Sequence, residues 1–161
     1  MNTIERISYI AGSTLLWLIF AMGGLVTAVI VPILSSDLVT TYSEYANDRV
    51  VIQLLMTMPA LIGMLIVLAV LLLLRLIHND RILSVSAYKW VQALSISAFG
   101  LAFSLLTIGF WLNSKNTFPP LIAVIVATGS LIALAVGFVT LTLRSLLKRA
   151  TTAIEELEGV I

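Results

Sequence analysis

The chain has 161 residues, of which 60% are hydrophobic and 11% are charged, and its mean hydropathy is +1.13. Soluble globular domains carry about 25% charged residues, so this composition excludes an ordinary water-soluble protein and indicates an integral membrane protein. The net charge of +1 argues against direct binding of nucleic acid. The absence of cysteine excludes disulfide and thiol chemistry.

Four apolar stretches are long enough to cross a bilayer, at about residues 7–34, 50–74, 90–112 and 119–143. A spanning helix needs about 20 apolar residues, and lipid forbids unpaired backbone groups, so each stretch is predicted to be a helix. We therefore predict an all-α fold, an integral membrane four-helix bundle that forms a single domain over residues 1–161. Residues 144–161 would follow the last span as a tail.

Positive charge is distributed unequally between the two sides of the predicted bundle. Arg49 and Lys115 lie on one side, and the other seven of the nine Lys and Arg residues lie on the opposite side. Short loops rich in Lys and Arg are retained in the cytoplasm. Both termini are therefore predicted to be cytoplasmic, in a multi-pass protein.

The connection between the first two stretches, residues 35–49, holds Leu38, Tyr42 and Tyr45 at helical spacing. This spacing favours an amphipathic turn that lies on the bilayer surface. The alternative is a patch of tyrosine and glutamate that faces a ligand.

No constellation of residues indicates an enzyme. Four-helix cytochromes need paired axial histidines, and His78 is the only histidine of the chain. Proton-coupled exporters need a carboxylate within the bilayer, and none of the four stretches contains one. Because glycine-rich phosphate loops, Ser/His/Asp sets and acidic metal clusters are also absent, we predict a non-enzymatic protein with no catalytic residue, metal site or cofactor.

Small and uncharged polar residues indicate how the helices pack. Gly129, Ala133 and Gly137 recur every four residues, and such a ridge lets another helix approach closely. The pattern leaves open whether that helix belongs to the same chain or to a second copy in a homo-oligomer. Gln53 is predicted to form hydrogen bonds between helices.

In the tail, the apolar residues recur at a regular spacing and the charged residues are separated by sign along the chain. Apolar residues continue at helical spacing, which predicts an amphipathic extension of the fourth helix, at Leu143, Leu146, Leu147, Ala150, Ile154 and Leu157. Cations come first and acidic residues follow, so the distal positions are candidates for docking a partner: Ile154, Glu155, Leu157 and Glu158. The alternative is a solvated helix end that only fixes topology. Thr152 and Glu155 also fit a capping box, so a break at Thr151-Thr152 stays open.

The same tail resembles a known signature. Residues 143–152, Leu-Arg-Ser-Leu-Leu-Lys-Arg-Ala-Thr-Thr, and the ending Glu-Leu-Glu-Gly-Val-Ile are similar to the C-terminus of a bacterial family of small four-helix membrane proteins of unknown function. Length and spans are similar over essentially the whole chain. Members of that family are often encoded beside a small Cro-like helix-turn-helix regulator, which implies a regulatory or sensory role. Many relatives carry Glu-Asn at the entry to the third helix, where this chain has Val85-Ser86-Ala87-Tyr88.

The leading hypothesis from the sequence is a bacterial inner-membrane protein that regulates or sequesters a cytoplasmic transcription factor. Its expected partners are the lipid bilayer and that regulator. The alternative is a small transporter, an accessory subunit, or an immunity protein against a membrane-active peptide.

Overall fold

The computed structural model of the protein describes residues 3–79, 85–115 and 120–159. These residues form long helices with short connections, and no strand occurs among them. Four helices are long and apolar enough to cross a membrane: Arg6–Thr41, Arg49–His78, Ala87–Ser114 and Pro120–Ile154. The all-α membrane fold predicted from the sequence is confirmed, and each helix extends beyond its apolar stretch.

The first span has a wider turn in its middle. It consists of α1 (Thr3–Leu25), the π-helical turn η1 (Val26–Ile30) and α2 (Val31–Thr41). A proline inside a helix lacks an amide hydrogen, and its ring collides with the carbonyl four residues earlier. The π-helical turn directly before Pro32 relieves this conflict, so the helix continues to Thr41 instead of ending near residue 34.

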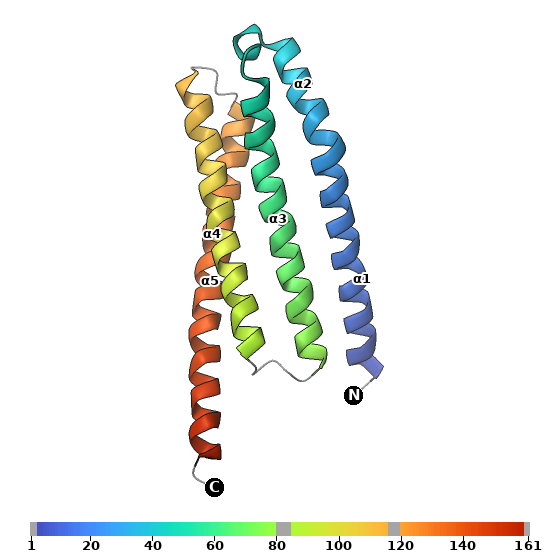
Figure 1. Ribbon diagram of the computed structural model, residues 1–161, viewed down its shortest axis with the longest axis vertical. Helices are drawn as coiled ribbons and strands as arrows, with labels where there is room; N and C mark the ends of the chain where they lie inside the picture. The colour runs from blue at the N-terminus through green and yellow to red at the C-terminus, as the bar shows by residue number, and fades with distance from the viewer. Residues whose placement is uncertain (1–2, 80–84, 116–119, 160–161) are drawn as a thin grey trace.

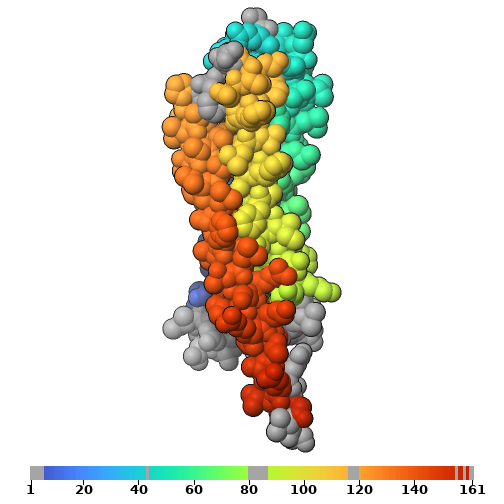
Figure 2. Space-filling view, turned by 90° about the vertical axis from the view of Figure 1, so that its left-hand side faces the viewer, coloured from blue at the N-terminus to red at the C-terminus, as the bar shows by residue number. Residues whose placement is uncertain are grey.

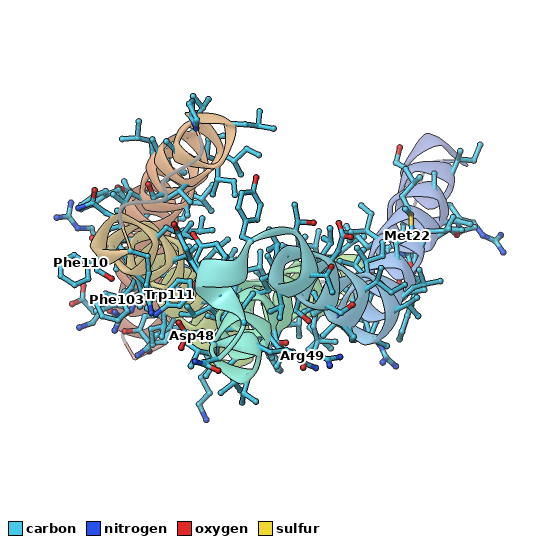
Figure 3. The ribbon with its side chains drawn as sticks, turned by 90° about the horizontal axis from the view of Figure 1, so that it is seen from above. Met22, Asp48, Arg49, Phe103, Phe110 and Trp111 are labelled. Atoms are coloured by element: carbon cyan, nitrogen blue, oxygen red, sulfur yellow. The ribbon has the colours of Figure 1, made fainter. Side chains whose placement is uncertain are left out.

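The helices pack in chain order. The first span contacts α3 (Arg49–His78), α3 contacts α4 (Val85–Ser114), and α4 contacts α5 (Pro120–Glu158). Seen from above, they form a curved row with α1 and α5 at its two ends (Figure 3). Short connections force such neighbours to be antiparallel.

Both termini lie at the same end of the molecule, which we call the termini side (Figure 1). The opposite end, the far side, carries the short 3₁₀ helix η2 (Ser43–Tyr45). On the termini side Tyr9 of α1 stacks on His78, the last residue of α3, with ring centroids 3.8 Å apart. On its way between the two sides, α3 passes through Pro59 without a break.

The side chains on the outer surface of the spans are mostly large and apolar, whereas the side chains buried between the helices are mostly small. Phe103 and Phe110 of α4 are 74% and 79% exposed and point away from the other helices (Figure 3). Ala87 and Ala98, by contrast, are fully buried on the opposite face of the same helix. Large side chains toward lipid and small ones between helices are the expected pattern in a membrane, because close backbone approach supplies the packing energy there.

Candidate functional site

The contact between α4 and α5 positions the part of α5 that leaves the membrane. On α5 a seam of small or medium-sized buried residues follows the helix in alternating steps of four and three: Val126, Ser130, Ala133, Gly137 and Thr140. This spacing is typical of helices that pack knobs into holes. On α4, Ser95, Ala98 and Ala102 are buried as well.

The predicted small-residue ridge shares Ala133 and Gly137 with this seam, and Gly129 lies next to it. A Cβ atom at Gly129 would lie 3.0 Å from Cδ1 of Leu105, and one at Gly137 would lie 3.0 Å from the Phe99 ring. The hydroxyl of Ser95 donates to the buried carbonyl of Gly137 at 3.3 Å, which joins the two helices directly. The structure thus places Gly129, Ala133 and Gly137 against α4 of the same chain, where the ridge is covered.

Gln53 does not take part in helix packing within this chain. Its side chain is exposed on α3, although its neighbour Ile52 is buried, because one residue turns the direction of the side chain by about 100° around the helix. Two other polar side chains bond within their own helix: Thr57 donates to the Gln53 carbonyl at 2.6 Å, and Ser130 donates to the Ala127 carbonyl at 3.0 Å. Among the described residues no hydrogen bond joins the Gln53 side chain to another helix of this chain, so the interhelical role of Gln53 stays a prediction.

The tail continues α5 without a break. The hydroxyl of Thr151 donates to the Leu147 carbonyl at 2.8 Å, and that of Thr152 donates to the Lys148 carbonyl at 3.0 Å. A capping threonine would instead accept from a backbone amide. The question left open at Thr151-Thr152 is settled in favour of one helix that reaches Glu158.

The end of α5 projects beyond the other helices (Figures 1 and 2). We call residues 145–158 the α5 extension. Among the predicted docking residues, Ile154 is 37% exposed and Leu157 is 70% exposed. The side chains of Glu155 and Glu158 lie outside what the structure describes.

The far side holds an apolar pocket of about 80 Å³. Its walls come from all the helices of the row except α1, and they are Leu38, Tyr42, Tyr45, Ile52, Leu55, Met56, Ile108, Trp111, Leu112 and Ile122. Tyr45 is only 4% exposed and stacks on Trp111, with ring centroids 5.7 Å apart. The predicted turn on the bilayer surface is therefore wrong for Tyr45, because its ring fills a space between helices.

An ion pair lies beside this pocket. Nζ of Lys115 lies 2.6 Å from Oδ2 of Asp48 and 5.7 Å from the centre of the Trp111 ring. Asp48 occupies the position before α3, yet its carboxylate does not cap the helix, since it is turned to Lys115. The pair links the connection before α3 to the end of α4.

Sequence reasoning missed these pairings. Asp48 and Lys115 are 67 residues apart, and Tyr88 and Arg144, which are bonded on the termini side, are 56 apart. Only the unequal distribution of cations set Lys115, together with Arg49, apart from the other seven Lys and Arg residues.

The described residues contain no group of three or more His, Cys, Asp or Glu side chains that could hold a metal ion. The arrangement instead offers an apolar pocket on one side and a projecting helix on the other. These features define a multi-pass helical membrane protein.

The chain belongs to the family described as "Protein of unknown function (DUF2975)", whose sequence model matches residues 33–161. The matched part begins within α2, so it is shorter than the whole-chain similarity inferred from the sequence. Searches of the curated proteins and of the solved structures gave no match.

Proposed function

We propose that this protein is a membrane-anchored regulator that holds a cytoplasmic transcription factor on the α5 extension. The observation that carries the proposal is the unbroken course of α5 past the other helices (Figure 1). A straight helix that leaves the bilayer cannot also lie flat on it. Its exposed apolar side chains are therefore carried into water, where a protein groove would bury them.

The geometry of the extension fits this role. At 1.5 Å per residue, Ile154 lies roughly 15 Å and Leu157 roughly 20 Å along the helix from Arg144. Ala150, Ile154 and Leu157 are all exposed and follow one another at spacings of four and three. Such a stripe is how an amphipathic helix enters an apolar groove of a partner.

Two further considerations support a cytoplasmic transcription factor as the partner. The excess of Lys and Arg favours a cytoplasmic position for the termini side. Relatives of the resembled family are often encoded beside a small helix-turn-helix regulator, which supports a transcription factor as the protein held there.

Truncation after Ala150 tests the proposal. The fourth span and its cations remain, so we expect normal insertion and an unchanged thermal midpoint in detergent, but loss of a helix-turn-helix protein from the co-purified material. The measurement is mass spectrometry of the tagged protein purified from its own host.

A finer pair of variants separates docking from folding. The double substitution Ile154→Ser and Leu157→Ser should reduce recovery of the regulator at least about tenfold, since two apolar anchors of about 1.5 kcal/mol each are lost. Thr152→Ser, two residues before Ile154 and on the opposite face of the helix, should leave recovery unchanged. Equal recovery with all variants would contradict the proposal and favour the transport or immunity hypothesis.

A further inference from the structure

A second feature of α5 lies where the helix leaves the membrane. Nε and Nη2 of Arg144 donate to the hydroxyl oxygen of Tyr88 on α4, at 2.9 and 2.6 Å. The guanidinium carbon lies 5.0 Å from the centre of the Tyr88 ring. This pairing continues the α4–α5 seam by one turn and holds the cation in a defined position.

The pairing leaves hydrogen-bond donors available. Arginine has five N–H donors in a fixed fork, so three remain after the two bonds to Tyr88. The Tyr88 oxygen accepts both bonds, so its own hydrogen can still be donated. The hydroxyl of Ser145, unlike that of Thr142 on the same helix, has no hydrogen bond to any described residue.

These groups line one open pocket of about 240 Å³, together with Leu141 and Lys148. Its polar lining consists of Tyr88, Arg144, Ser145 and Lys148, and it contains no carboxylate. Neither Arg144 nor Lys148 forms an ion pair with a described residue. The pocket therefore combines two cations and two hydroxyls with no anion of its own.

The pocket also lies at the depth of lipid headgroups. Arg144 is 24 residues along α5 from Pro120, or roughly 36 Å, and the hydrocarbon core is about 30 Å thick. Tyr88 and Trp111 mark the two ends of α4, as aromatic residues do at the two membrane interfaces. A phosphate group is the anion found at this depth.

We propose that Tyr88, Arg144, Ser145 and Lys148 form a binding site for the phosphate group of an anionic phospholipid. The Arg144 fork binds two phosphate oxygens, the two hydroxyls donate to others, and Lys148 adds charge. Tyr88 positions Arg144 for this contact. The site does not depend on a protein partner, because its α5 residues precede Ile154 by roughly two to three turns of the helix.

Native mass spectrometry in a neutral detergent tests the site. Phosphatidylglycerol should bind more tightly than phosphatidylcholine, whose choline group neutralises its phosphate. Arg144→Gln should weaken phosphatidylglycerol binding by about tenfold, and Lys148→Gln by about fivefold. Tyr88→Phe should weaken it by about threefold, since Arg144 stays charged but loses its fixed position.

Arg149→Gln is the matched control, because it removes an equal charge one residue away from Lys148 and outside the pocket. Its lipid affinity should stay within about twofold of the native value. Equal losses for Lys148→Gln and Arg149→Gln, or equal binding of the two lipids, would overturn the proposal. Because Lys148 is exposed, its replacement keeps the test valid even if Arg144→Gln weakens the fold.

A competition arm distinguishes a lipid from a soluble source of phosphate. Inorganic phosphate at millimolar concentration should not displace phosphatidylglycerol from the native protein. Displacement that depends on Arg144 would support the phosphate chemistry of the pocket but overturn the assignment to lipid.

Discussion

Substitution of Gly137 by leucine is expected to lower the thermal unfolding midpoint in detergent by about 5 to 10 °C. A Cβ atom at this position already lies within 3.0 to 3.1 Å of three carbons of the Phe99 ring. That ring is held edge-on by Phe138, with centroids 5.3 Å apart, so it cannot turn aside freely. The larger side chain must therefore push α4 and α5 apart and break the hydrogen bond from Ser95 to the Gly137 carbonyl.

The matched control for this experiment is Gly63→Leu in α3. No atom lies within 4 Å of a Cβ built at Gly63, so the same change should leave the midpoint unaltered or raise it slightly through better helix propensity. Equal melting of the native protein and Gly137→Leu would contradict the close packing of α4 on α5.

Tyr45→Ala is expected to reduce the free energy of unfolding by about 3 kcal/mol, the typical cost of removing a buried aromatic ring. The ring is 4% exposed, stacks on Trp111 and lines the far-side pocket, so its loss enlarges an existing cavity. The helices around it would lose contacts that lipid replaces poorly. Thermal unfolding in detergent measures the effect.

Tyr42→Ala provides the comparison, because Tyr42 lies three residues earlier and is 44% exposed. We expect it to cost less than half as much as Tyr45→Ala. If the two alanine variants melted alike, the burial of the Tyr45 ring between the helices would not stabilise the far side.

Much of the fold could be predicted from the sequence. Lipid leaves the backbone no partner outside its own helix, so an apolar stretch of sufficient length specifies a spanning helix by itself. The extension of α5 could be anticipated for a similar reason, since its apolar residues keep helical spacing after the membrane ends.

The order of packing could not be predicted in this way. Gly129 and Gly137 indicate that a backbone comes close, but the shapes of Leu105 and Phe99 decide that α4 is the neighbour. The bond between Tyr88 and Arg144 forms only when α4 and α5 adopt one register, and no local pattern encodes a register between distant residues. Gln53 shows a similar limit, because a polar residue in an apolar stretch need not face another helix of the same chain.

We propose a topology in which four helices span the membrane and the α5 extension lies in the cytoplasm. Because the chain has no cysteine, single cysteines can be placed without interference, at the exposed residues Asn47 on the far side and Asn79 on the termini side. We measure their reaction with a membrane-impermeant thiol reagent in intact cells and after permeabilisation. We expect Asn47→Cys to react in intact cells and Asn79→Cys to react only after permeabilisation. Reaction of Asn79→Cys in intact cells would contradict the proposed topology.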